Sequence, residues 1–111
     1  SDERKNILAK HSSSIREVEN LNEVIDELDI LYATRVQGER FATKEEYDVV
    51  KNSYCIGKKD FVNAKKDVII MHPLPRVNEI HPDVDTLPNA KYFEQAANGV
   101  FVRMALLSLI K

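Results

Sequence analysis

Two continuous apolar runs dominate the pattern of the sequence. Residues 30–34 read ILYAT and residues 68–71 read VIIM, and neither run alternates with polar positions. A short, unbroken apolar run is typical of a strand that is covered on both faces, as in a parallel sheet. Because right-handed crossovers join parallel strands, we expect both strands to lie in one sheet and to point the same way.

Helical patterns separate and follow these strands. Residues 21–28 place apolar side chains at helical spacing behind Asn20, which pairs with Glu23 in a capping-box pattern. The last stretch, residues 89–110, is a long helix pattern. One face of this helix carries its apolar residues, which are Phe93, Ala96, Ala97, Val100, Met104 and Leu107.

The order of helices and strands predicts an α/β fold, with a partial Rossmann-like parallel sheet flanked by helices and a long C-terminal helix. Weaker patterns add a brief strand at residues 15–18 and a helix at residues 59–66. Two convincing strands are fewer than such a sheet normally has. We therefore expect residues 1–111 to form one partial domain whose first strands precede Ser1.

Composition narrows the possible partners. The chain has 111 residues, of which 43% are apolar and 31% charged, and a formal net charge of -2. These values are typical of a globular chain and provide no strong field for nucleic acid or an anionic membrane. The single cysteine, Cys55, fits a reducing compartment. The three histidines of the chain are scattered and its glycines are few, so we expect neither a metal site nor a phosphate-binding glycine loop.

Candidate chemistry follows each strand, because ligands of an open parallel sheet bind beyond the carboxyl ends of its strands. Guanidinium groups bind carboxylates through two parallel hydrogen bonds, and glutamine adds a neutral donor. The pattern suits a small anion such as a dicarboxylate, although arginines that merely pair with Glu39 in a solvated loop are the alternative. The residues concerned are Arg35, Gln37, Arg40, His72 and Arg76, offset by Glu39 and Glu79.

Residues 72–76 (HPLPR), here called the shelf, are unusually stiff. Each proline removes a backbone donor, fixes its own φ and disfavours helical geometry in the residue before it. We therefore expect His72 and Leu74 to be extended and the shelf carbonyls to be free acceptors. An NH2 group of a ligand would bind such a row with little ordering cost. His72 alone fits a satisfied loop histidine better than a catalytic one.

The last helix contains two unusual positions. Gly99 lies in its interior, where glycine costs roughly 1 kcal/mol relative to alanine, so close packing or a helix break is expected there. Arg103 stands among apolar neighbours and reads as a snorkelling side chain or an internal ion-pair partner. A ligand role for Arg103 is the less favoured interpretation.

Three motifs in order resemble aspartate carbamoyltransferase. They are DILYATRVQGERF at residues 29–41, DVIIMHPLPRVNEI at residues 67–80 and YFEQAANGVFVRMALLSL at residues 92–109. The resemblance covers the chain from about residue 20 to its end and, more weakly, its start. Ornithine carbamoyltransferases have Cys-Leu-Pro after the corresponding histidine, whereas this chain has Pro73 before Leu74 and Pro75. The resemblance therefore favours aspartate as the acceptor.

The resemblance implies transfer of the carbamoyl group of carbamoyl phosphate to L-aspartate, without a cofactor, a metal or a covalent intermediate. It assigns Arg35 and Gln37 to the aspartate carboxylate, and the backbone carbonyls of Leu74 and Pro75 to the carbamoyl amino group. No residue of the chain is expected to be catalytic in the narrow sense, because such enzymes act mainly by positioning and charge stabilisation. Supporting positions would be Glu39, Arg40, His72, Arg76, Glu79 and Arg103.

The resemblance also implies the setting and marks departures from the family. Relatives are cytoplasmic homotrimers of pyrimidine biosynthesis that use small-molecule substrates rather than nucleic acid or membranes. Gly38 replaces a longer and often basic residue, and the family's Ser-Thr-Arg-Thr and His-Pro-Thr-Gln motifs for carbamoyl phosphate are not among these residues. We therefore expect an aspartate-side wall of a site. A non-catalytic amino-acid-binding or interaction module of the same fold, or an ornithine enzyme, is the alternative.

Overall fold

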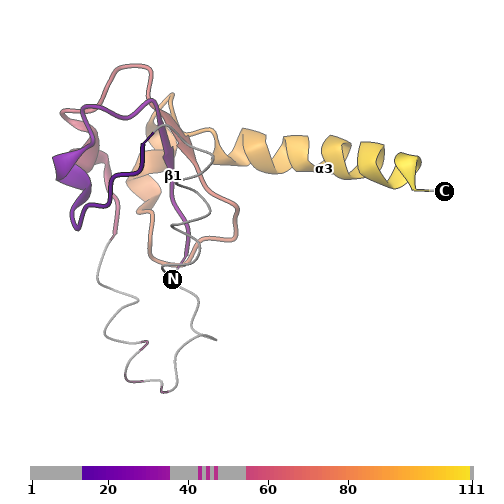
Figure 1. Ribbon diagram of the computed structural model, residues 1–111, viewed down its shortest axis with the longest axis horizontal. Coiled ribbons are helices and arrows are strands. Elements are labelled where there is room, and N and C mark those ends of the chain that lie inside the picture. The colour runs from indigo at the N-terminus through magenta and orange to yellow at the C-terminus, as the bar shows by residue number, and fades with distance from the viewer. Residues whose placement is uncertain (1–13, 36–42, 44, 46, 48–54, 111) are drawn as a thin grey trace.

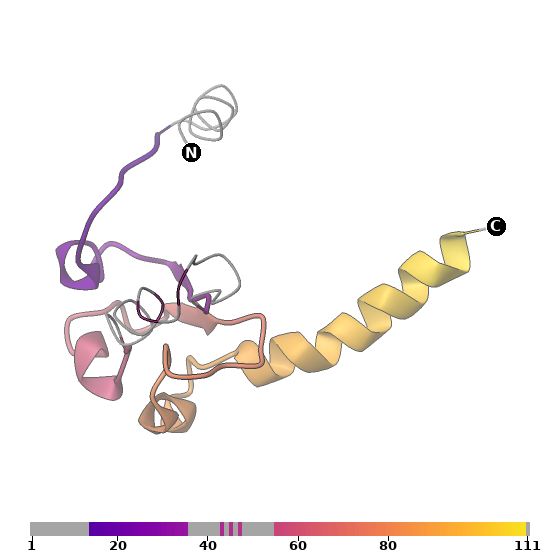
Figure 2. The ribbon, with the colours of Figure 1, turned by 90° about the horizontal axis from the view of Figure 1, so that it is seen from below.

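The computed structural model describes residues 14–35, 43, 45, 47 and 55–110. Within them the chain order is η1 (Leu21–Glu23), β1 (Ile30–Tyr32), η3 (Lys58–Phe61), β2 (Ile69–Met71), η4 (Pro82–Thr86) and α3 (Tyr92–Leu109). The 3-10 helices and the two strands form a small body, and α3 projects away from it (Figures 1 and 2). Among these residues, no helix has both the length and the apolar character needed to span a bilayer.

The two apolar runs form parallel strands, as predicted. Ile30 pairs with Ile69, and the register continues to Tyr32 and Met71. On its other side β2 is joined to the segment that leads into α3, because the Ile70 N–H donates to the Asn89 carbonyl and the Lys91 N–H donates to the Ile70 carbonyl, both at 2.9 Å. Strand β2 is thus hydrogen-bonded along both of its edges.

The core lies on one face of this sheet only. Ile70 is fully buried, and the residues that cluster with it are Ala33, Ile56, Ile80, Val84 and Tyr92. On the opposite face Ile30 is 54% exposed and Ile69 is 40% exposed. The expectation of cover on both faces is therefore wrong for the described residues. Strand side chains alternate between faces, and the buried residues of η4 and of the first turn of α3 pack on the side of Ile70.

Three other predicted elements are absent or shortened. Residues 15–18 form no strand, and Ile15 and Val18 are exposed. The predicted helix at residues 21–28 is reduced to η1, although the Asn20 N–H does bond to the Glu23 carboxylate at 2.9 Å, as the capping pattern predicted. The helix pattern at residues 59–66 is likewise reduced to η3. Short helices are marginal without tertiary packing, and neither η1 nor η3 contains a buried residue.

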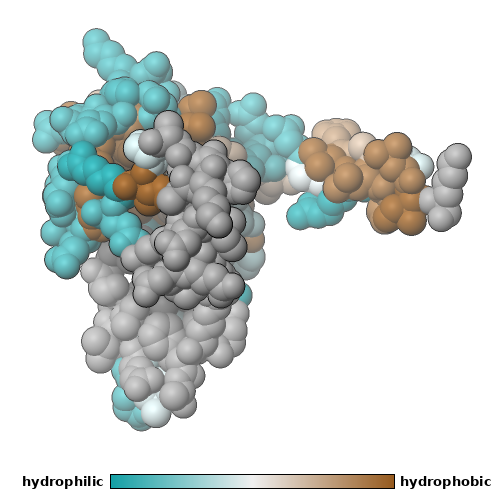
Figure 3. Space-filling model, in the orientation of Figure 1, coloured by the Kyte–Doolittle hydropathy of each residue, from teal (hydrophilic) through white to brown (hydrophobic). Residues whose placement is uncertain are grey.

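Helix α3 confirms the long C-terminal helix, but not as a buried element. Tyr92 at its first turn is fully buried, whereas the apolar residues of its second half, such as Phe101 at 70%, are exposed. Figure 3 shows these apolar side chains along the projecting helix. The helix continues through Gly99, where an added Cβ would lie 2.9 Å from Arg103 Nη1. The predicted helix break is therefore absent, and the atoms nearest such a Cβ belong to the flexible end of the Arg103 side chain.

Ile70→Ala should lower the free energy of unfolding of this chain by about 2–5 kcal/mol, because it removes a fully buried side chain from the core. Ile69→Ala, in the same strand but on the open face, is the matched control and should cost markedly less. Urea unfolding followed by circular dichroism measures both. Equal losses would show that the core does not lie on the face of Ile70.

Candidate functional site

The two predicted binding segments leave the same edge of the sheet. The ladder runs past β1, because the Ala33 N–H donates to the Met71 carbonyl at 2.9 Å. Arg35 follows within two residues and is exposed, and the shelf begins directly after Met71. The structure thus places Arg35 and the shelf at one end of adjacent parallel strands. The other predicted residues of this loop, Gln37, Glu39 and Arg40, lie outside the described residues, as does Gly38.

The shelf does not run extended, contrary to prediction. Leu74 has φ 39°, and the Leu74–Pro75 peptide bond is cis. The Leu74 N–H turns back to donate to His72 Nδ1 at 2.9 Å, so a local hydrogen bond closes a tight turn where the prolines alone predicted a straight segment. A positive φ is uncommon for a residue other than glycine and persists only where the surroundings hold it. The surroundings of Leu74 therefore decide the shape of the shelf.

The carbonyls of Leu74 and Pro75 are available as acceptors. In the part of the chain that the structure describes, no N–H or O–H group donates to either of them. Leu74 is half-buried against the core, and Pro75 is exposed. Two neighbouring acceptors at the end of a strand fit a ligand NH2 group, which carries two donors.

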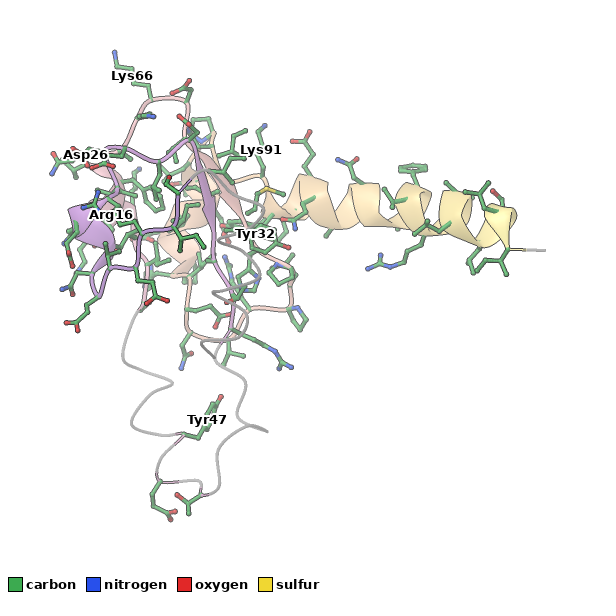
Figure 4. All side chains as sticks on the ribbon, in the orientation of Figure 1. Arg16, Asp26, Tyr32, Tyr47, Lys66 and Lys91 are labelled. Atoms are coloured by element: carbon green, nitrogen blue, oxygen red, sulfur yellow. The ribbon has the colours of Figure 1, made fainter. Side chains whose placement is uncertain are left out.

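His72 is buried, and its backbone N–H and both ring nitrogens are hydrogen-bonded. Because a backbone N–H can only donate, the bond from Leu74 requires Nδ1 to be the unprotonated nitrogen. The proton of the neutral ring therefore sits on Nε2, which donates to Glu79 Oε1 at 2.7 Å. The His72 backbone N–H donates to Gln95 Oε1 at 3.0 Å, and Gln95 Nε2 donates to the Tyr32 hydroxyl at 3.0 Å. Figure 4 shows Tyr32 beside the start of α3.

Glu79 is the buried acceptor at the centre of this arrangement. Its Oε2 accepts from the N–H groups of Val77 at 3.1 Å and Asn78 at 3.0 Å, while Oε1 accepts from His72. Burial by itself would raise the pKa of Glu79. The backbone N–H groups and the imidazole outweigh burial, and the pKa is lowered from its ordinary value of 4.5. Glu79 is therefore a carboxylate at neutral pH.

Arg76 is engaged by protein groups rather than held out for an anion. Its Nη1 bonds to Asp85 Oδ1, and its Nη2 donates to Asp85 Oδ2 at 2.6 Å. The guanidinium also lies 5.7 Å from the centre of the Tyr92 ring. Arg76 lowers the pKa of Asp85, and burial together with Asp85 raises the pKa of Tyr92 to about 12. The pattern that grouped Arg76 with anion ligands is thus corrected to a structural pairing.

Arg103 lies about three turns along α3 from Tyr92. It lines a groove of about 780 Å³ between the open face of the sheet and α3, where Tyr32, Met71 and Pro73 form the opposite wall. Its guanidinium packs over Gly99, so the side chain snorkels along the helix, and it forms no ion pair within the described residues.

Among the residues that the structure describes, no group of three His, Cys, Asp or Glu side chains could hold a metal ion.

Sequence reasoning missed the partners that fix the shelf. The sequence suggested no role for Asp85, and Tyr92 and Gln95 were only positions within the predicted C-terminal helix. The sequence contains one signal for the partner of Arg76. A half-buried arginine needs a carboxylate, and Asp83 and Asp85 follow the shelf closely in sequence. Which carboxylate Arg76 would meet depends on the turn of η4.

A family model described as aspartate/ornithine carbamoyltransferase, Asp/Orn binding domain, matches residues 1–110. The aspartate carbamoyltransferase catalytic subunit of Alkaliphilus oremlandii is 50% identical over 109 residues, which cover 98% of this chain and 33% of that protein. The corresponding subunit of Thermofilum pendens is 52% identical over 106 residues, which cover 96% and 34%. The chain thus spans about a third of the length of these curated relatives.

Solved structures agree. The catalytic subunit of M. jannaschii aspartate transcarbamoylase has a TM-score of 0.80 and 47% identity, over 96% of this chain and 35% of that one. Aspartate transcarbamoylase from Trypanosoma cruzi, in complex with carbamoyl phosphate and aspartate, has a TM-score of 0.68 and 39% identity, over 78% and 28%. The likeness confirms the predicted α/β class.

Glu79→Gln should lower the free energy of unfolding by about 1.5–3 kcal/mol at pH 7, because hydrogen bonds to a buried charged acceptor are lost. Since folding lowers the pKa of Glu79, its contribution is complete above about 4.5 and is lost as the pH falls through the lower, folded value. The gap between the parent chain and the variant should therefore narrow below pH 4.5 in urea titrations. Glu94→Gln, at an exposed site on α3, is the control. A gap that stays constant with pH would contradict this assignment.

Proposed function

Because the chain belongs to the aspartate/ornithine carbamoyltransferase family, as its Asp/Orn-binding domain, we propose that it forms the aspartate side of an aspartate carbamoyltransferase. The reaction transfers the carbamoyl group of carbamoyl phosphate to L-aspartate and yields N-carbamoyl-L-aspartate and phosphate. Relatives named aspartate carbamoyltransferase at about 50% identity over nearly the whole chain support aspartate over ornithine, as does Pro73 in place of cysteine. The observation that carries the proposal is the shelf at the strand edge beside Arg35, whose Leu74 and Pro75 carbonyls accept no hydrogen bond from the described residues.

The proposed mechanism is one of positioning. Arg35 and Gln37 bind the aspartate carboxylate, and the carbonyls of Leu74 and Pro75 accept the two N–H bonds of the carbamoyl NH2 group. Held at both ends, the amine and the carbamoyl carbon react as if within one molecule. The carbonyls of Leu74 and Pro75 are neutral hydrogen-bond acceptors, so binding the NH2 group changes the protonation state of no residue in the chain. No group of this chain bonds covalently to the substrate, and no cofactor or metal is invoked.

The relatives are about three times longer than this chain, so the phosphate-binding part of the site belongs to the remainder of such a protein. We place the activity in a cytoplasmic homotrimer of de novo pyrimidine biosynthesis, with L-aspartate and carbamoyl phosphate as its small-molecule partners. The T. cruzi relative in complex with both compounds supports this choice of substrates. The naming of the relatives as aspartate carbamoyltransferases favours the transferase over a non-catalytic amino-acid-binding or interaction module.

A hybrid in which this chain replaces the matching segment of the Alkaliphilus oremlandii subunit tests the proposal. The hybrid should form N-carbamoyl-L-aspartate. In it, Arg35→Ala should raise the KM for aspartate by roughly 10- to 100-fold, since a charge-assisted contact to the carboxylate is lost, while affinity for carbamoyl phosphate changes little. Arg16→Ala, an exposed arginine that pairs with Glu27 at 3.1 Å, is the matched control and should leave both unchanged. A hybrid that folds without activity, or equal loss of both affinities, would contradict the proposal.

The purified 111-residue chain should have no transferase activity, because the residues proposed to bind phosphate are not part of it. A radiometric assay with labelled aspartate detects N-carbamoyl-L-aspartate at low levels. Turnover by the chain alone would show that these residues contain a complete site.

A further inference from the structure

The carbonyls of the shelf owe their direction to a buried pair. Leu74 has a positive φ, which a leucine does not adopt unless neighbouring groups impose it. We propose, on the basis of the function proposed above, that His72 and Glu79 are positioning residues that set the Leu74 and Pro75 carbonyls for the carbamoyl group. Neither touches the substrate, since the His72 side chain is fully buried and that of Glu79 is 5% exposed.

His72 holds the shelf at its first residue and at its bend. Its backbone N–H is held by Gln95 of α3, its Nδ1 accepts from the Leu74 N–H at 2.9 Å, and its Nε2 donates to Glu79 at 2.7 Å. The bond to Leu74 is the one that reaches the bend directly. The bond to Glu79 fixes the plane of the ring and the tautomer that can accept from Leu74.

Glu79 ties the far side of the shelf to the same ring. By accepting from the N–H groups of Val77 and Asn78, it fixes the backbone that leaves Arg76. One carboxylate thus connects residues on both sides of the Pro73–Leu74–Pro75 segment. Charge-assisted hydrogen bonds of this kind are stronger than neutral ones. The Pro73–Leu74–Pro75 segment is therefore anchored at both of its ends, by His72 before it and by the Val77 and Asn78 N–H groups after it.

Two substitutions at His72 separate the bond to the bend from the bond to Glu79. In His72→Asn the Oδ1 atom takes the place of Nδ1 and can still accept from Leu74, but the side chain is too short to reach Glu79. In His72→Gln the amide nitrogen takes the place of Nε2 and can still donate to Glu79, but no acceptor remains for Leu74. Each variant keeps one of the two hydrogen bonds that the imidazole makes and loses the other. The thermal midpoints of the two variants should therefore fall by similar amounts.

In the active hybrid, His72→Gln should lower kcat by roughly 10- to 100-fold, since small misplacement of a substrate-positioning group has effects of this size, while His72→Asn stays within about threefold. The KM for aspartate should change by less than about twofold in both, because Arg35 rather than the shelf holds the aspartate. Equal losses of kcat in the two variants, or losses that follow only the thermal midpoints, would overturn the positioning role.

A measurement without substitution gives a second test if a variant does not fold. Nitrogen-15 spectra of the imidazole of His72 in the hybrid should show a proton on Nε2 that exchanges slowly and an unprotonated Nδ1. A proton on Nδ1 would overturn the proposal, since that nitrogen could not accept from Leu74. An inactive but folded parent hybrid with this tautomer would count against the proposed function and leave the hydrogen-bond geometry standing.

Discussion

The pairing of β2 along both of its edges is the constraint on which the rest of this structure depends. Its residues bond to β1 on one side and to the segment before α3 on the other, and Ile70 at its centre has no exposed surface. Because backbone groups that are buried must be paired, this strand cannot shift without breaking bonds on both sides. The end of β2 therefore places the start of the shelf, the start of α3 and Arg35 relative to one another.

From that fixed end, the site is built by side chains that bind backbone. His72 and Glu79 bond to N–H groups within and after the shelf, and Arg76 is held by Asp85 and Tyr92 beside α3. The side chains of His72, Arg76 and Glu79, which the motif suggested as ligand groups, are here bonded to other protein groups, and we propose the shelf carbonyls as the groups that bind the ligand. Such a division suits a reaction in which correct placement, rather than a catalytic side chain, does the chemistry.

The surface of the chain differs on its two sides. The core face of the sheet is sealed by residues from η4 and the first turn of α3, while the other face and the outer half of α3 expose large apolar side chains, as Figure 3 shows for the helix. Exposed apolar surface of this extent is typical of a surface that other protein covers. It is in keeping with relatives three times as long as this chain.

The sequence by itself determined the two strands, their parallel direction, the long C-terminal helix and the place of the shelf, because apolar runs, helical periodicity and prolines act locally on the chain. It also predicted the shelf carbonyls as acceptors for a ligand. Only the tertiary structure decided that Leu74 turns instead of extending, that one face of the sheet is open, and which partners hold His72 and Arg76. The partners of His72 and Arg76 are Glu79 just before η4, Asp85 in η4 and Gln95 in α3, so their positions depend on how these segments turn and dock on the sheet. Contacts between residues far apart in the chain leave no periodic signal, so no local pattern could have revealed them.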